Sequence, residues 1–280
     1  MRTSSYPGLL AEKSLLYAKT LLTAKDAKSL YRALLVKLED EVLVERLRRP
    51  RRIGAGKQTV VNFDISFYCD NHTVSMYYEI FGATAYSFFP TFVPQDGDIV
   101  VDIGANQGIF TCYAAKRAPR GWVYAVEPDV ENLSRLKAHL ELNRISNVTV
   151  IPKCVGDRAS KACFRKGDSS GTGYVVDVGE QGPGFTEVDQ ITLEEMMTTY
   201  QLPKIDLLKI DVEGFEAKVL SGADGRLASI RRIVLEYHSP MLANEVAGIL
   251  KDKGFRLLPN PGPVRSHILY FENSALCGGQ

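Results

Sequence analysis

The sequence predicts an α/β protein with a doubly wound, Rossmann-like sheet and a helical extension at its N-terminus. From about residue 96 onward, apolar runs of strand length alternate with stretches of helical periodicity, as expected for a mostly parallel sheet covered on both faces. Near the N-terminus, apolar residues instead recur three and four positions apart. We therefore expect a helical extension over 1–56, a β-hairpin and linker over 57–95, and the α/β domain over 96–280.

The N-terminal extension is predicted to be amphipathic and helical from Leu9 to Leu47. Its apolar face consists of Leu30, Leu34, Leu38 and Val42. A basic cluster follows and is interrupted by Pro50, which indicates the end of the helix and a linker; the cluster contains Arg46, Arg48, Arg49, Arg51 and Arg52. A lid over an acceptor and a homodimer contact are both compatible with such an extension.

Between Thr59 and Phe81, β-branched and aromatic residues alternate with polar ones, which predicts a short hairpin. Asp70-Asn71-His72 is the expected turn. Five parallel strands should follow, at Ile99–Ile103, Trp122–Val126, Val148–Ile151, Ile205–Ile210 and Ile233–Glu236. The helices between them are expected at Phe110–Lys116, Glu131–Leu142 and Phe215–Leu220. Two more strands, Phe255–Leu258 and His267–Phe271, should form a C-terminal antiparallel hairpin and bring the sheet to seven strands.

Composition restricts the class of protein and its partners. The 280 residues are 45% hydrophobic and 24% charged, as in an ordinary soluble globular protein. A formal net charge of +1 argues against a general affinity for nucleic acid. The five cysteines are widely spaced and contain no Cys-x-x-Cys pair, so a reducing cytoplasm is the expected location. No stretch is apolar enough to predict a membrane span.

The segment Val100–Gly108 joins an apolar strand to a glycine-containing turn at the start of a helix. Gly104 allows a tight turn and a close ligand approach. Glu127 lies 23 positions beyond Gly104, near the spacing at which an acidic residue binds a ribose in dinucleotide folds. A dinucleotide enzyme would need two further glycines where Asn106 and Ile109 stand. The turn therefore favours a ligand that has a ribose but no pyrophosphate.

These residues resemble the FkbM family of S-adenosylmethionine-dependent methyltransferases, within the class I methyltransferase fold. The resemblance covers about the last two thirds of the chain and rests on three segments, VDIGANQG (101–108), VYAVEPD (123–129) and LKIDVEGFE (208–216). It implies that the cofactor is S-adenosylmethionine and that 96–280 is the methyltransferase domain. Its implied cofactor residues are Asp102, Gly104, Asn106 and Gly108 at the methionine end, Glu127 at the ribose and Asp157 beside the adenine.

Candidate catalytic residues follow the fourth and fifth predicted strands. Asp211 and Glu213 come after one strand, and Glu236 and His238 end the next, at the same edge of the sheet as the cofactor turn. His238, Asp211 or Glu213 could accept the proton of a hydroxyl or amine. An alternative is that the carboxylates cap the following helix. A divalent cation bound by Asp211, Glu213 and Glu236 is not favoured, and no metal ligand is assigned.

The resemblance implies O-methylation of a small-molecule acceptor, such as a sugar or natural-product hydroxyl, and N-methylation stays open. RNA methylation through the cluster between Arg46 and Arg52 is the main alternative, although nucleic acid is a less expected partner. A catalytically silent protein that docks partners through its N-terminal helix is a third hypothesis. Tyr86, Phe88 and Phe89 are either a cover for the cofactor or part of the core.

Overall fold

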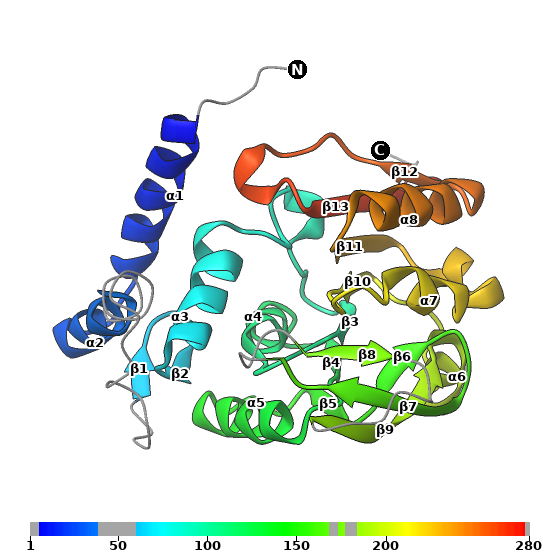
Figure 1. Ribbon diagram of the computed structural model, residues 1–280, viewed down its shortest axis with the longest axis horizontal. Coiled ribbons are helices and arrows are strands. Elements are labelled where there is room, and N and C mark those ends of the chain that lie inside the picture. Colours follow the sequence, from blue (N-terminus) through cyan, green and yellow to red (C-terminus); the bar gives the residue numbers. More distant parts are fainter. Residues whose placement is uncertain (1–5, 39–59, 168–172, 177–183, 278–280) are drawn as a thin grey trace.

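The computed structural model describes residues 6–38, 60–167, 173–176 and 184–277. Its central sheet has seven strands in the order β12-β13-β11-β10-β3-β4-β5 (Figure 1). They are β3 (Ile99–Ile103), β4 (Trp122–Val126), β5 (Val148–Ile151), β10 (Leu207–Ile210), β11 (Arg232–Glu236), β12 (Phe255–Leu257) and β13 (Ile268–Asn273). β13 is antiparallel to both of its neighbours, whereas β3, β4, β5, β10 and β11 are parallel. The predicted fold class is confirmed.

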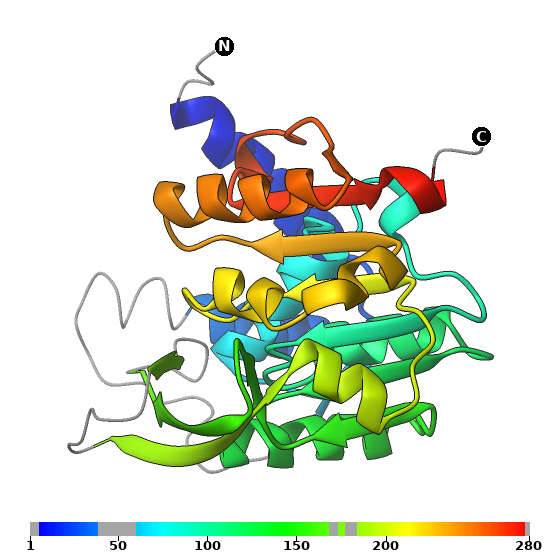
Figure 2. The same ribbon diagram turned by 90° about the vertical axis from the view of Figure 1, so that its right-hand side faces the viewer.

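Helices cover both faces of this sheet because side chains of successive strand residues point to opposite faces. Val100 belongs to a core shared with α4 (Ile109–Arg117) and α5 (Val130–Leu142). Val101 belongs to a second core on the other face, which is shared with three further helices (Figure 2). These are α6 (Leu193–Thr199), α7 (Glu216–Ser221) and α8 (Pro240–Asp252).

The strand order places a topological switch point between β3 and β10. From β3 the chain continues to β4 on one side, whereas β10 pairs with β3 on the other. The loops that follow the two strands therefore leave in opposite directions, which opens a crevice at the carboxyl edge of the sheet. Ile205, which was predicted to begin the fourth strand, instead forms an isolated bridge with Ile230.

A second sheet of four strands, in the order β6-β9-β7-β8, was not predicted. It projects from the chain between β5 and α6, in green in Figure 1. Ala162 and Phe164 are buried, whereas Lys161 and Arg165 are exposed, so β7 does show the alternation of a half-buried strand. The strands are β6 (Cys154–Gly156), β7 (Ser160–Arg165), β8 (Tyr174–Val176) and β9 (Phe185–Thr192).

The described part of the N-terminal extension contains two separate helices, α1 (Tyr6–Leu21) and α2 (Ala27–Leu38). Asp26 lies between them, and its carboxylate accepts the Ser29 backbone N–H at 2.7 Å, which starts a new helix. The buried face of α2 contains Ser29 and Ala33, whereas Leu34 is exposed. Val42 and the basic cluster from Arg46 to Arg52 lie outside the described residues.

The predicted hairpin is shorter than expected, and its predicted turn is wrong. β1 (Val60–Asn62) pairs with β2 (Ser66–Tyr68), so the turn lies at 63–65. Asp70 instead caps α3 (Asn71–Tyr77): its side chain accepts the Thr73 N–H at 2.8 Å, and Thr73 Oγ1 accepts the Asp70 N–H. Asp-Asn pairs suit turns and helix starts alike, and Thr73 completes a capping box.

Shorter helical segments complete the described chain. A π-helical turn (Tyr78–Gly82) follows α3. Three 3₁₀ turns occur at Pro90–Phe92, Asp224–Ser229 and Pro263–Arg265, and α9 (Ser274–Cys277) follows the last strand. Within the described ranges, no helix combines the length and apolarity needed to cross a membrane.

Candidate functional site

The turn after β3 requires glycine because two segments of backbone meet there. Gly104 has φ +75°, and a Cβ at this position would lie 1.7 Å from the backbone oxygen of Asp211, after β10. Asn106 also has a left-handed backbone, with φ +50°. The backbone N–H groups of Gly104 and Ala105 both donate to the Val126 carbonyl at 3.0 Å. The turn is therefore joined to the strands on either side of it.

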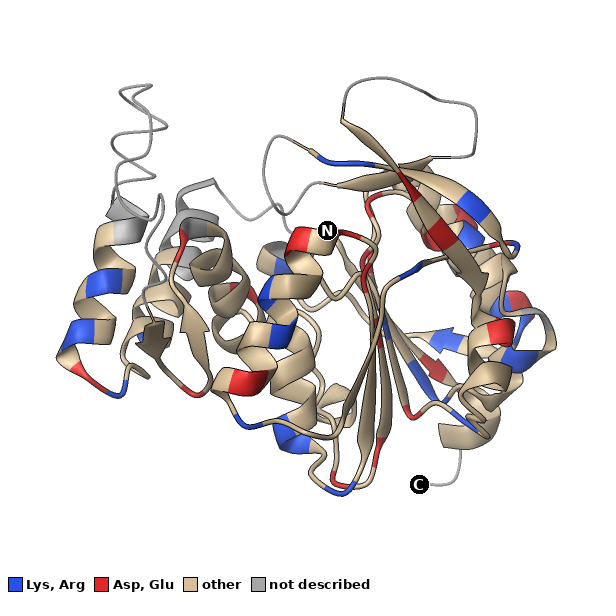
Figure 3. Cartoon of the chain, turned by 90° about the horizontal axis from the view of Figure 1, so that it is seen from below, with Lys and Arg blue, Asp and Glu red and all other residues tan. Residues whose placement is uncertain are grey.

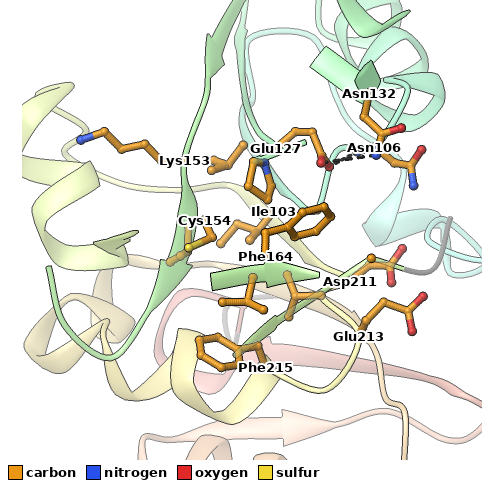
Figure 4. A pocket seen from close by; sticks show the side chains of 17 residues that line it. Ile103, Asn106, Glu127, Asn132, Lys153, Cys154, Phe164, Asp211, Glu213 and Phe215 are labelled. Atoms are coloured by element: carbon orange, nitrogen blue, oxygen red, sulfur yellow. Dashed lines mark hydrogen bonds between the residues drawn. The ribbon is translucent and has the colours of Figure 1, made fainter. Parts of the chain in front are cut away.

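Glu127 is held beside this turn by backbone N–H groups. Its Oε2 accepts from Asn106 at 2.8 Å, and its Oε1 accepts from Asp129 at 2.9 Å (Figure 4). Burial raises the pKa of Glu127 to about 7, and the two backbone hydrogen bonds oppose that rise. Each carboxylate oxygen retains capacity for a further hydrogen bond, so Glu127 is suited to accept from a ligand hydroxyl.

Gly104, Asn106 and Glu127 line a cavity at the carboxyl edge of the central sheet. In Figure 4, Asn106, Asp211 and Glu213 lie on one side of this cavity, and Cys154 lies on the opposite side. The wall near Cys154 is largely apolar and was missed by sequence reasoning; it includes Val126, Val155, Phe164 and Val175. Phe164 and Val175 come from the second sheet, whose role no recognised motif marked.

The other predicted cofactor residues do not line this cavity. Asp102 is fully buried, where it accepts from the Thr111 hydroxyl at 2.6 Å. Gly108 precedes α4 with φ +80°, and a Cβ there would lie 2.7 Å from Leu136 Cγ. The carboxylate of Asp157 lies 3.5 Å from Arg158. Asp102 and Gly108 thus support the turn through contacts outside the cavity.

Lys209, which sequence reasoning passed over, links the two loops of the crevice. Its buried ammonium lies 3.1 Å from Asp102 and 3.5 Å from Asp211 and donates to the Gly104 carbonyl at 2.8 Å. Burial acts to lower the pKa of Lys209, but the two carboxylates outweigh it and raise the pKa above its ordinary value. Lys209 is therefore a cation that positions both the glycine turn and Asp211.

His238 lies among three carboxylates. Its Nδ1 is 2.6 Å from Glu216, and its Nε2 is 3.3 Å from Glu213 and 4.0 Å from Asp211. Burial acts to lower the pKa of His238, but the hydrogen bond to Glu216 and the negative charge of all three groups raise it to about 9. At neutral pH His238 is thus an imidazolium, which differs from the free base considered from the sequence.

Tyr86 joins Asp211 to Glu236. Its hydroxyl lies 3.1 Å from an Asp211 oxygen and 2.9 Å from a Glu236 oxygen and shares its proton between them. The ring is buried against Phe110, so Tyr86 belongs to the core while its hydroxyl reaches the predicted catalytic groups. Burial raises the pKa of Glu236 to about 7, and Asp211 adds to the rise. The other three predicted catalytic residues, Glu213, Glu236 and His238, therefore lie around Asp211.

Two histidines connect the cofactor turn to the segment before the sheet. His139 is buried in α5; its Nε2 accepts the Tyr68 backbone N–H at 3.1 Å, so its Nδ1 carries the proton that is donated to the Gln107 carbonyl at 2.7 Å. Burial lowers the pKa of His139 to about 4, so the ring is neutral at pH 7. His72 in α3 lies 3.0 Å from the Asn106 side-chain oxygen.

Comparison with known proteins bears on this arrangement. The family model described as "Methyltransferase FkbM domain" matches residues 102–257, which is more than half of the chain. This chain belongs to the FkbM methyltransferase family. The match begins at Asp102 and includes both Glu127 and the 208–216 segment, so the family predicted from these motifs is confirmed.

Three curated relatives of this FkbM-family chain illustrate its diversity. The AMB antimetabolite synthetase AmbE of Pseudomonas aeruginosa is 31% identical in an alignment of length 232, which covers 67% of this chain and 11% of that protein. The hexuronic acid methyltransferase AglP of Haloferax volcanii is 26% identical in an alignment of length 162, which covers 56% of this chain and 63% of that protein. The 31-O-demethyl-FK506 methyltransferase FkbM of Streptomyces tacrolimicus is 26% identical in an alignment of length 204, which covers 61% of this chain and 77% of that protein.

Solved structures show weaker likeness to the FkbM-family chain. Aeropyrum pernix fibrillarin, solved with natively bound S-adenosylmethionine, is 16% identical, covers 69% of this chain and 74% of its own, and has a TM-score of 0.43. A putative methyltransferase from Streptococcus mutans in complex with SAH is 13% identical, covers 65% and 92%, and also has a TM-score of 0.43. These likenesses are too weak to carry an argument about function.

The basic cluster on which the RNA alternative depends, Arg46–Arg52, lies outside the described residues of this FkbM-family chain. Among the residues that Figure 3 colours, Lys and Arg are interspersed with Asp and Glu. The sequence-based metal alternative also differs from what the structure assembles: Glu213 pairs with His238, and Glu236 lies with Glu79 and His267.

Proposed function

We propose that this protein transfers the methyl group of S-adenosylmethionine to a hydroxyl of a small molecule, such as a sugar or a natural product. The observation that carries the proposal is that carboxylates suited to two different tasks line the same cavity. Glu127 is suited to hold ribose hydroxyls, and Glu213 with Asp211 on another part of the lining is suited to accept a proton. The family supplies the type of reaction, whereas the acceptor is inferred.

The chemistry of the cavity walls fits S-adenosylmethionine. The apolar wall containing Phe164, Val155 and Val126 suits an adenine ring. Glu127 suits the ribose diol, as an acidic residue after the second strand does in related nucleotide folds. Asn106 occupies the position where a pyrophosphate-binding glycine would be needed, so the turn suits a ligand without phosphates.

When bound, S-adenosylmethionine supplies a methyl group already activated by its sulfonium. The residues of the chain then have to orient the acceptor and receive its proton. We assign proton acceptance to Glu213, which lines the cavity, has a left-handed backbone with φ +51°, and is half-buried. Burial raises the pKa of Glu213, and the neighbouring Asp211 adds to the rise. A raised pKa makes the Glu213 carboxylate a stronger base, with a pKa closer to the operating pH.

His238 has a supporting role in this proposal. Because it is an imidazolium at neutral pH, it stabilises the ionised form of Glu213 rather than taking the first proton itself. Asp211 is held by Lys209 and by the Tyr86 hydroxyl, so it is positioned to orient the acceptor beside Glu213. Glu236 is one hydrogen-bonded step further away, behind Tyr86.

The names of two relatives support the choice of acceptor class. One is named for a 31-O-demethyl substrate and another for hexuronic acid, which is a sugar acid. Because the chain spans only 11% and 63% of the first two relatives, its substrates stay part of the proposal. Homodimerisation through the N-terminal helices, a cytoplasmic location and the three-part division at 56 and 95 stay predictions as well.

Two linked measurements test the proposal. Calorimetric titration with S-adenosylmethionine should show one site per chain. Glu127→Ala should weaken the binding by about tenfold or more, because the ligand loses a buried hydrogen-bond acceptor. Glu131→Gln, at an exposed carboxylate in the first turn of α5, is the matched control and should bind normally.

Methyl transfer is then followed with labelled S-adenosylmethionine and a fractionated cell extract. We expect label in a small-molecule fraction, on an ether oxygen. Absence of cofactor binding would overturn the enzymatic proposal and leave a partner-binding protein. Label in RNA would instead support the nucleic-acid alternative.

A further inference from the structure

We propose that Glu79, Glu236 and His267 bind a divalent first-row transition-metal ion beside the acceptor side of the cavity. His267 Nε2 lies 3.5 Å from a Glu236 oxygen and 3.9 Å from a Glu79 oxygen. One ligand atom from each of the three residues lies within 4.8 Å of the others. The three come from the π-helical turn, the end of β11 and the residue before β13.

The separations are close to those that a bound ion needs. Imidazole nitrogen and carboxylate oxygen bind such ions at about 2.0–2.2 Å, so adjacent ligands lie about 3.0–3.4 Å apart. The two separations from His267, 3.5 and 3.9 Å, require these side chains to close by about half an ångström, and the two carboxylate oxygens lie within 4.8 Å of each other. A small rotation of side chains that are still partly exposed achieves this.

Two of the ligands stand on a rigid frame. Glu236 pairs with Ile268 in the antiparallel β11-β13 ladder. His267 directly precedes Ile268, so the ladder holds it next to Glu236. The Tyr237 backbone N–H donates to the His267 carbonyl at 3.0 Å and continues the ladder past its end. The backbone of Glu79 is held by a hydrogen bond from the Ala85 N–H at 3.0 Å. The fold therefore already fixes the backbone of the three ligands, so binding an ion requires little further ordering of the chain.

The donor set selects among metals. One imidazole and two carboxylates suit Mn²⁺, Fe²⁺ or Zn²⁺, whereas Ca²⁺ and Mg²⁺ prefer oxygen ligands alone. Three protein ligands leave at least one coordination position open. The side chains of Glu79 and His267 are 36% and 42% exposed, so an ion and a further ligand can reach the site.

The arrangement of carboxylates also favours a cation. Glu79 and Glu236 each bring a carboxylate oxygen to His267. The carboxylate of Asp211 is linked to Glu236 through the Tyr86 hydroxyl.

The location gives such an ion a use, and this step rests on the proposed function. The Tyr86 hydroxyl connects Glu236 to Asp211, which lines the cavity. An ion with an open position there could hold a second hydroxyl of a polyhydroxylated acceptor and orient it toward Asp211 and Glu213. Binding of the ion itself requires neither cofactor nor acceptor.

The test is a titration of the full chain with MnCl₂. Binding is measured as the loss of the free Mn²⁺ signal in electron paramagnetic resonance. We expect about one ion per chain, and Glu79→Gln and His267→Asn should each weaken binding by about tenfold or more. Glu187→Gln, at an exposed carboxylate of the second sheet, should bind as the unaltered protein does. Circular dichroism checks that each variant is folded.

Absence of stoichiometric binding, or equal binding by both ligand variants and the unaltered protein, would overturn the metal site. Since the titration contains no S-adenosylmethionine, such a result would leave methyl transfer intact. Conversely, Mn²⁺ binding without cofactor binding would support the metal site while the proposed function failed.

Discussion

The cofactor side and the acceptor side of the cavity are held by different interactions. On the cofactor side, backbone N–H groups hold Glu127 in place, and glycine allows the close approach of two loops. On the acceptor side, Glu213 and His238 are positioned by contacts between charged side chains. The shape of the first side thus depends mainly on backbone geometry, whereas that of the second depends on the protonation of each member. Lys209 belongs to both.

The largest expected effect comes from removing that shared cation. Lys209→Met leaves Asp102 buried without its counter-ion, which should lower the free energy of unfolding by about 3–5 kcal/mol. Urea denaturation at pH 7 measures the loss. Lys161→Met is the matched control: Lys161 pairs with Asp189 at 2.8 Å, and both side chains are more than half exposed, so its loss should change the free energy of unfolding little. Similar losses for the two variants would refute the central role of Lys209.

The next effect separates the two sides. Glu213→Gln keeps the shape of the side chain but removes the proton acceptor, so kcat should fall by about 10²–10⁴-fold. The calorimetric affinity for S-adenosylmethionine should change little, because Glu127 and the apolar wall are untouched. Glu195→Gln, exposed on α6, is the control. A kcat within about threefold of the unaltered enzyme would exclude Glu213 as the base.

A smaller effect is expected at the apolar wall. Phe164→Ala removes an aromatic face from the region assigned to adenine, which should weaken S-adenosylmethionine binding by about tenfold while leaving kcat at saturation nearly unchanged. Phe185→Ala is the matched control, because Phe185 pairs with Arg165 in the same sheet but does not line the cavity. Equal affinities for the two variants would remove Phe164 from the cofactor site.

The smallest effect concerns the charge of His238. Its pKa in the folded protein, about 9, is above the ordinary 6.5, so its stabilising contribution is complete below pH 6.5 and is lost as pH rises through 9. Thermal unfolding of His238→Gln should therefore differ from that of the unaltered protein by a few degrees at pH 6.5 and by less at pH 10. A difference that does not shrink with rising pH would contradict the imidazolium assignment.

Sequence patterns located the sheet well but the surrounding elements less well. β3, β4 and β5 begin and end where predicted, because buried parallel strands are continuous apolar runs between turn residues. The hairpin turn was misplaced because Asp70-Asn71 is compatible with both a turn and a helix start. In the second sheet, which was missed, β6 and β8 are three residues long and too short to show a period, whereas the alternation in β7 was present but not recognised.

The sequence by itself determined the family, the fold class and the position of Gly104, Asn106 and Glu127, because local turn chemistry and strand order depend on residues near one another in the chain. Only the tertiary structure decided that Asp102 is buried behind the turn, that Lys209 joins the two loops and that Phe164 reaches the cavity. It also decided the charge of His238. Such properties depend on burial and on partners tens of residues away, which no local pattern records.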